Sequence, residues 1–258
     1  MATLAIETNE LTRKYGEKTA VNRLTLTIPQ GEIFGFLGHN GAGKTTTISL
    51  LTTLLLPTSG NARIFGNDVV QKNREVRQRI GYVPENVRLY NDLTVAENLR
   101  YLGELSGVAA IDKRIEEVLH LLEHPEWRDL RLGTFSKGMR QRIGIAQALL
   151  HQPAILFLDE PASGLDPEGQ RAIGDLIVRL NHEFGITIFM NTHQLSEAAK
   201  LCTSIGIMNH GRLVVADTLA NVMQRFPDTP SLEEIYLQVE RREEQNGRFP
   251  AASGVTQS

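Results

Sequence analysis

Short runs of alternating apolar and polar residues mark the N-terminal part of the chain. They occur at Leu4–Thr8, Thr19–Ile28 and Ala62–Phe65, with turn-forming residues between them. A two-residue period places apolar side chains on one face of a strand and polar side chains on the other. The pattern therefore predicts a small antiparallel β flap.

A second group of runs is apolar with little alternation. Ile33–Leu37, Ala154–Leu158 and Ile186–Met190 belong to it, and such runs are typical of strands buried on both faces of a parallel sheet. Two further apolar runs flank the segment Asn209-His210-Gly211 and predict a hairpin. These strands predict an α/β core that begins at Ile33.

Between residues 86 and 152 the pattern becomes helical. Thr94 and Glu97 have the spacing of a capping box, and Asp112 is the expected cap of a second helix. Apolar residues follow this cap at helical spacing: Ile115, Val118, Leu119 and Leu122. A last helix is expected to begin near Ser136. We therefore expect an inserted helical lobe over 86–152.

The segment beyond Thr218 is expected to be accessory. Ser231 and Glu234 can cap a helix that runs to about Glu244, and small or polar residues at 251–258 are typical of a frayed tail. The predicted organisation is one domain over 1–225, interrupted by the helical lobe, followed by an accessory helix and flexible tail over 226–258.

A glycine-rich segment follows the apolar run that begins at Ile33. It fits the pattern G-x-x-x-x-G-K-[ST] of a phosphate-binding loop. Glycines let successive N–H groups converge on phosphate oxygens at a helix N-terminus, while Lys44 adds a charge and Thr45 a hydroxyl ligand for Mg²⁺. The alternative is a simple turn between strand and helix. The candidate nucleotide-binding residues here are Gly38, His39, Asn40, Gly41, Ala42, Gly43, Lys44, Thr45 and Thr46.

Two carboxylates, Asp159 and Glu160, come directly after the run Ala154–Leu158. Ligands bind at the carboxyl ends of strands in parallel α/β sheets, so Asp159 is placed to reach the Mg²⁺ and Glu160 to face an attacking water. A solvated acidic turn is the alternative interpretation.

A third segment, Phe135–Gln141, lies shortly before these carboxylates and opens a helix. Together the three segments resemble the nucleotide-binding domain of ATP-binding cassette (ABC) proteins over roughly residues 4–225. The resemblance implies a P-loop NTPase (RecA-like) core with an antiparallel β flap and an inserted α-helical subdomain. It also implies that Ser136 and Gly138 belong to a signature motif that contacts the γ-phosphate of ATP.

The resemblance assigns further positions. Tyr15 is similar to the aromatic residue that stacks on adenine, and Asp166 lies in a segment similar to the D-loop. His193 is similar to the switch histidine that contacts the γ-phosphate. Glu85 holds the position where most members carry the Q-loop glutamine, and a carboxylate there would be a further Mg²⁺ ligand.

Two motifs depart from the commonest family pattern. Glu85 replaces a neutral amide with a charged ligand, and the signature reads Phe-Ser-Lys-Gly-Met where many members have Leu-Ser-Gly-Gly-Gln, which adds the charge of Lys137. Lys137 has two open roles: contact with a nucleotide across an interface, or exposure to solvent. Variants of this kind resemble the branch of ABC ATPases that serve ABC-2-type exporters.

Composition and charge limit the class of partner and the cellular location that we expect for this chain. A net charge of −3 without a sustained basic stripe gives no electrostatic footprint for nucleic acid. No apolar run reaches the roughly 20 residues that span a bilayer. A single cysteine, Cys202, excludes an intrachain disulfide. We therefore expect a cytoplasmic protein, bound peripherally to the cytoplasmic face of a membrane.

The family pattern implies a machine of several chains. Two nucleotide-binding subunits, expected here as a homodimer, would sandwich ATP and Mg²⁺ and drive an integral-membrane permease made by a separate chain. Glu160 would orient or deprotonate water, His193 would help to position it, and Lys44 would balance developing charge. A soluble ABC ATPase that remodels a cytosolic complex is the alternative, and a catalytically dead binding module is a third. The transported substrate stays open, because the permease supplies its pocket.

Overall fold

The N-terminal strands form the flap that alternation predicts. The computed structural model describes residues 3–227, 229 and 231–246. In its antiparallel flap the strand order is β2-β1-β4-β5. The strands are β1 (Leu4–Tyr15), β2 (Lys18–Pro29), β4 (Ser59–Ile64) and β5 (Asn67–Asp68). They are longer than the alternating runs suggested, and register shifts interrupt the pairing of β1 with β2.

The continuous apolar runs form the central sheet. Its strand order is β10-β9-β3-β8-β7-β6, with β3, β6, β7, β8 and β9 parallel and β10 antiparallel to β9. The strands are β3 (Ile33–Leu37), β6 (Ile80–Val83), β7 (Ile155–Asp159), β8 (Thr187–Thr192), β9 (Ser204–Asn209) and β10 (Arg212–Thr218). The predicted hairpin of β9 and β10 is confirmed, with a tight turn at His210-Gly211.

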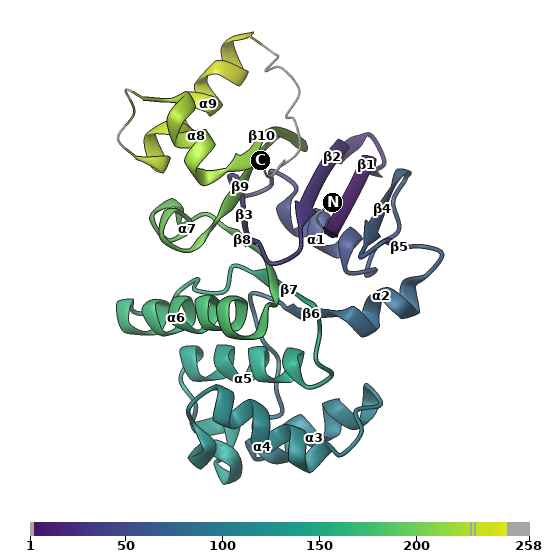
Figure 1. Cartoon of the computed structure of the whole chain (residues 1–258), viewed down its shortest axis with the longest axis vertical. Helices are drawn as coiled ribbons and strands as arrows, with labels where there is room; N and C mark the ends of the chain where they lie inside the picture. Colours follow the sequence, from purple (N-terminus) through teal and green to yellow (C-terminus); the bar gives the residue numbers. More distant parts are fainter. Residues whose placement is uncertain (1–2, 228, 230, 247–258) are drawn as a thin grey trace.

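Helices surround the sheet and connect its strands. They are α1 (Lys44–Leu51), α2 (Asn73–Arg79), α6 (Pro167–Phe184), α7 (Leu195–Leu201), α8 (Leu219–Arg225) and α9 (Leu232–Asn246). Figure 1 shows the flap on one side of the sheet, with α8 and α9 at one end of the molecule. Among the described residues, no helix is long and apolar enough to cross a membrane.

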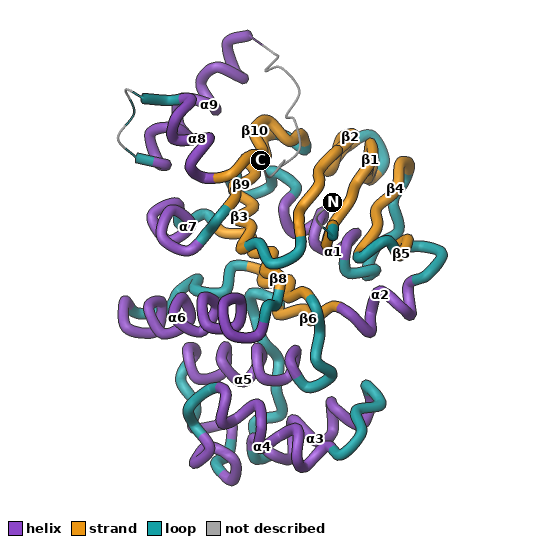
Figure 2. The backbone as a smooth tube through the Cα atoms, viewed as in Figure 1, coloured by secondary structure: helices purple, strands orange, loops and turns teal. Residues whose placement is uncertain are grey.

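The helical lobe occupies the opposite end of the molecule. It consists of α3 (Val95–Leu105), α4 (Ile111–Leu121), the 3₁₀ turns η1 (Pro125–Asp129) and η2 (Leu132–Thr134), and α5 (Lys137–Leu149). Figure 2 shows this end as helix and loop, whereas the orange strands gather in the other half. The insertion of a helical lobe is thus confirmed.

Helix starts in the lobe test two sequence predictions. The capping box of Thr94 and Glu97 is present at the start of α3. The prediction that Asp112 caps α4 is wrong: the cap is Ala110, in a left-handed conformation with φ 48°. Asp112 lies in the first helical turn and pairs with Arg100 of α3. The four predicted apolar residues of this helix are all buried: Ile115, Val118, Leu119 and Leu122.

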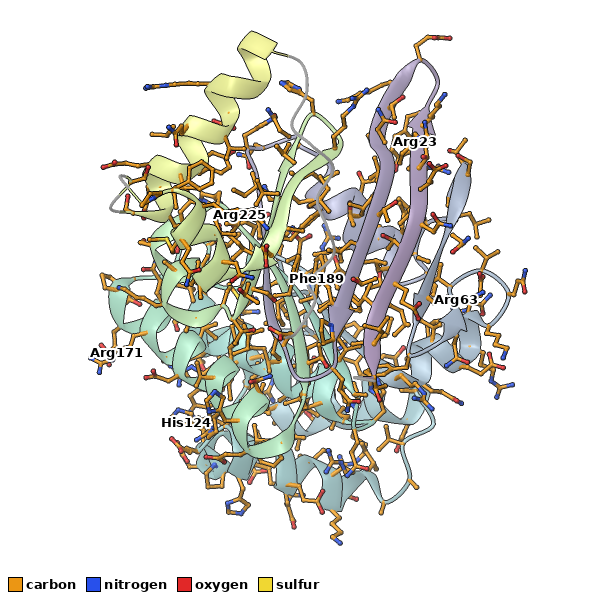
Figure 3. The ribbon with its side chains drawn as sticks, turned by 45° about the horizontal axis from the view of Figure 1, so that its top comes forward. Arg23, Arg63, His124, Arg171, Phe189 and Arg225 are labelled. Carbon is orange, nitrogen blue, oxygen red and sulfur yellow. The ribbon has the colours of Figure 1, made fainter. Side chains whose placement is uncertain are left out.

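The central sheet is buried on both faces, as its apolar strands predict. Phe157 of β7 packs toward the flap with Phe189, their ring centroids 5.4 Å apart, while Leu156 and Leu158 join the core shared with the helical lobe. Figure 3 shows Phe189 in the interior, with Arg171 at the periphery. Cys202 is also buried, and burial raises the pKa of its thiol to about 12.

The accessory helix α9 packs against α7, and its residues Leu232, Ile235 and Val239 are buried. Ser231 accepts a hydrogen bond from the backbone N–H of Glu234, so the predicted helix start is confirmed. The domain boundary at residue 225 stays a prediction. The predicted tail at 251–258 lies outside the described residues.

Candidate functional site

The glycine-rich loop connects β3 to α1 at the carboxyl edge of the central sheet. Its backbone requires glycine at two points. Gly43 has φ 110°, and a Cβ there would lie 2.2 Å from the carbonyl oxygen of Ala20. Gly41 has φ 85° and faces open space. Side chains resist such left-handed angles, so the sequence pattern and the loop shape agree.

Lys44 is the first residue of α1 and is nearly buried, with 6% of its surface exposed. Its ammonium group donates to the carbonyl oxygens of Gly38, at 2.5 Å, and His39, at 3.2 Å. Burial lowers the pKa of Lys44, and the nearby charges of Glu160 and Asp159 partly oppose this shift. The loop therefore holds a desolvated positive charge, which strengthens its attraction for an anion.

Asp159 ends β7 and lies opposite Asn191 of β8 in the register of the parallel sheet. Its Oδ1 accepts hydrogen bonds from Asn191 Nδ2, at 2.6 Å, and from Thr45 Oγ1, at 3.3 Å. Burial raises the pKa of Asp159, and the charge of Glu85 acts in the same direction. The predicted pair of Thr45 and Asp159 is thus in contact in the structure.

Asn191 is a site residue that the sequence interpretation missed. Besides holding Asp159, its Oδ1 accepts a hydrogen bond of 2.7 Å from the backbone N–H of Glu160. Asn191 is fully buried. The signal in the sequence was an amide at the end of an otherwise apolar strand, where a buried polar side chain needs partners.

Glu160 and His193 face each other across the ends of β7 and β8. His193 Nδ1 lies 2.7 Å from Glu160 Oε2. Glu160 has φ 49°, a left-handed angle that is uncommon outside glycine, and its N–H is held by Asn191. Strain of this kind gathers at functional sites, where the surrounding structure maintains it.

A cleft of about 400 Å³ joins the glycine-rich loop to Asp159 and Glu160, and His193 is not among the residues that line it. It is lined by Tyr15, Lys18, Ala20, Asn40, Gly41, Gly43, Lys44, Thr45, Thr46, Glu85, Asp159 and Glu160. Tyr15 projects from the end of β1 with 45% of its surface exposed, and the guanidinium of Arg13 lies 4.7 Å from its ring centroid. The flap and the core thus share one cleft, as the resemblance implies.

Oxygen donors meet in this cleft: the hydroxyl of Thr45 and the carboxylates of Asp159 and Glu85. Hard oxygen ligands suit Mg²⁺, which usually takes one or two carboxylates and completes its shell with phosphates and water. No group of three or more His, Cys, Asp or Glu side chains in the described part of the chain could hold a metal by itself. The oxygen donors of Thr45, Asp159 and Glu85 fit Mg²⁺ with phosphate and water in its remaining positions.

Six predicted nucleotide contacts do not line this cleft, and three of them lie far from the glycine-rich loop. Ser136 caps α5, where its Oγ accepts from the N–H of Met139 at 3.3 Å, and Gly138 lies in the first turn of the same helix. Asp166 caps α6 by accepting from the N–H of Gly169 at 2.9 Å. None of the three lines the cleft of its own chain.

The other three, Gly38, His39 and Ala42, are part of the loop but do not line the cleft either. The ring of His39 makes a 3.1 Å contact through Nε2 with Asn209 Oδ1 at the end of β9. His39 ties the loop to its surroundings.

Known proteins share this arrangement. The family model described as "ABC transporter" matches residues 21–163, more than half of the chain. A bacitracin transport ATP-binding protein of Bacillus licheniformis is 44% identical over 209 residues, covering 81% of this chain and 68% of the relative. A daunorubicin/doxorubicin resistance ATP-binding protein of Streptomyces peucetius is 41% identical over 218 residues, covering 84% and 66%.

Solved structures agree with the sequence relatives. An ATP-binding subunit of an ABC transporter superposes with a TM-score of 0.80 at 29% identity, covering 92% of this chain and 99% of that one. A dimeric ATP-binding cassette, bound to ADP and phosphate in a post-hydrolysis state, has a TM-score of 0.73 at 27% identity and covers 83% and 98%. The chain therefore belongs to the ABC transporter family, as an ATP-binding and ATP-hydrolysing subunit of the exporter type.

Proposed function

We propose that this chain hydrolyses MgATP in a head-to-tail pair of nucleotide-binding subunits and thereby powers export through a membrane permease formed by a separate chain. One observation carries the proposal. Lys44, Thr45, Asp159 and Glu160 meet in one cleft, whereas the signature residues Ser136 and Gly138 lie outside it. A second subunit that contributes its signature would complete the site.

Each residue has a role in this proposal. The N–H groups of the loop and the ammonium of Lys44 bind the phosphates, and Tyr15 stacks on the base. Thr45, Asp159 and Glu85 would hold Mg²⁺, which neutralises phosphate charge when bound. Glu160 takes a proton from the attacking water, and the His193 ring 2.7 Å away helps to position that water.

The partner subunit supplies the remaining contacts. At the start of its α5, the hydroxyl of Ser136 and the backbone N–H of Gly138 donate hydrogen bonds to the γ-phosphate. The helix dipole favours an anion at this position. Asp166 lies in the same interface beside the signature. Two identical chains can form two working sites, because each carries both halves of a site.

The names of the relatives support the exporter role. They mention bacitracin transport, linearmycin resistance and daunorubicin/doxorubicin resistance. We propose that this chain likewise serves an exporter and binds its permease on the cytoplasmic face of the membrane, through the surface near Glu85 and the helical lobe. A soluble remodelling ATPase is not favoured by these relatives.

Sizing the Glu160→Gln variant with and without MgATP tests the paired site. Loss of the base leaves ATP binding intact, so we expect MgATP to shift this variant from monomer to dimer. Glu160→Gln combined with Lys44→Ala should stay monomeric, and Glu183→Gln, an exposed acid on α6, should hydrolyse ATP like the wild type. A monomer of Glu160→Gln at saturating nucleotide would contradict the proposal.

A further inference from the structure

Lys137, the second residue of the signature, contacts the turn that follows the proposed catalytic carboxylate. Its ammonium group donates a 2.5 Å hydrogen bond to the carbonyl oxygen of Ser163 in the same chain. A Cβ on Gly164 would lie 2.8 Å from the Lys137 nitrogen, so the ammonium rests on the Ser163-Gly164 peptide. This intrachain contact adds a third role to the two sequence-based expectations for Lys137, which were exposure to solvent and contact with a nucleotide across an interface.

The turn that receives Lys137 is connected directly to the catalytic residues. The backbone N–H of Ser163 donates to the carbonyl oxygen of Glu160 at 3.1 Å. The hydroxyl of Ser163 donates to Glu85 Oε1 at 3.3 Å. Ser163 therefore links the end of β7, the loop after β6 and, through Lys137, the start of α5.

Packing supports the same connection. A Cβ on Gly138 would lie 3.8 Å from the side chain of Leu165, so the first turn of α5 packs against the segment that leads into α6. The two helices lie side by side in Figure 1. The signature end of the helical lobe thus contacts the catalytic turn through the charged hydrogen bond of Lys137, and Leu165 lies beside Gly138.

We propose that Lys137 is a positioning residue that holds the Glu160–Leu165 turn against the signature helix of its own chain. The position of the helical lobe then governs the orientation of the Glu160 carboxylate. The acceptor of Lys137 is a backbone carbonyl, and the bond therefore constrains the path of the chain that carries Glu160. The inference rests on the proposed role of Glu160 in ATP hydrolysis.

Water competes for an exposed lysine, so the effect is moderate. A change in rate of about 3- to 10-fold corresponds to about 0.65–1.4 kcal/mol, which is within the net worth of one hydrogen bond. Lys137→Met keeps most of the aliphatic stem and removes the charge and the donors. Lys137→Arg keeps a charged donor. Lys113→Met removes a comparably exposed lysine elsewhere in the lobe, whose partner Glu117 Oε1 lies 3.7 Å away.

The test compares kcat and KM for ATP in these three variants. We expect kcat of Lys137→Met to fall about 3- to 10-fold while KM changes less than about twofold, since a misaimed base slows chemistry and leaves nucleotide binding intact. Lys137→Arg should recover at least half of the wild-type kcat, and Lys113→Met should match the wild type. Equal kcat values for Lys137→Met and Lys113→Met would overturn the proposal.

Dimerisation in the Glu160→Gln background separates positioning from nucleotide contact. If Lys137 acts within its own chain, adding Lys137→Met leaves unchanged the MgATP concentration needed for half-maximal dimer. A severalfold increase in that concentration would overturn the proposal, since it would place Lys137 on the partner's nucleotide. If wild-type protein hydrolyses no ATP, or Glu160→Gln forms no dimer, the proposed function itself fails and this inference fails with it.

Discussion

The two halves of the proposed nucleotide site differ in how much of their geometry the chain itself settles. On the core side, Lys44 and Asp159 are each only 6% exposed and hydrogen-bonded within the chain. On the lobe side, Ser136 is exposed at the start of α5. The contrast indicates that hydrogen bonds within the chain hold the core half in place, whereas in the proposed dimer the lobe half faces the partner subunit.

Removing the proposed base gives the largest effect on the core side. Glu160→Gln should lower the rate of ATP hydrolysis by about 10²- to 10⁴-fold, the usual worth of a positioned general base. ATP affinity should stay near the wild-type value. Phosphate release measures the rate of hydrolysis, and equilibrium nucleotide binding measures the affinity. A hydrolysis rate within about threefold of wild type would show that Glu160 is not the general base.

Removing the buried charge of the loop comes next. Lys44→Ala should weaken ATP binding by about 10- to 100-fold, in keeping with about 1.5–3 kcal/mol for a hydrogen bond to a charged group. The fold should persist, because the side chain faces loop carbonyls and the cleft. Calorimetric titration of the folded variant measures affinity, with Lys113→Ala as control. Unchanged affinity would show that the cleft is not the phosphate site.

Asn191 tests whether the core side is held together by its own hydrogen bonds. Asn191→Ala removes the partner of buried Asp159 and of the Glu160 N–H, so we expect the free energy of unfolding to fall by about 1–3 kcal/mol. ATPase activity should fall as well. Urea denaturation gives the stability, and Asn61→Ala, at an exposed flap position, should stay within about 0.5 kcal/mol of wild type. Equal stability of the two variants would mean that the hydrogen bonds of Asn191 to Asp159 and Glu160 do not stabilise the fold.

The smallest expected effect concerns the fold of the lobe. Thr94→Ala breaks the capping box of α3 and should cost about 0.5–2 kcal/mol of stability. Asp112→Ala removes exposed ion pairs with Arg100 and Arg128, which solvent screens, and should cost less stability than Thr94→Ala. Denaturation of both variants decides the order. A larger loss of stability in Asp112→Ala than in Thr94→Ala would support Asp112 as the cap of α4, as the sequence predicted.

Much of this architecture follows from short-range patterns. The phosphate loop, the apolar strands and the caps at Thr94 and Ser136 each depend on residues a few positions apart, and all are present. Asp112 shows the limit of such reasoning. A carboxylate ahead of an apolar helical pattern predicts a cap, yet Arg100, on another helix, pairs with it inside the first turn.

The sequence by itself therefore determined the local chemistry: a phosphate loop, two carboxylates at a strand end, a histidine after a neighbouring strand, and a helical insertion. Only the tertiary structure decided which strand lies beside which, and with it that Asn191 holds Asp159 and that Lys137 reaches Ser163. The physical reason is separation along the chain. Contacts between residues tens of positions apart depend on sheet order and helix packing, and these arise from the whole core together.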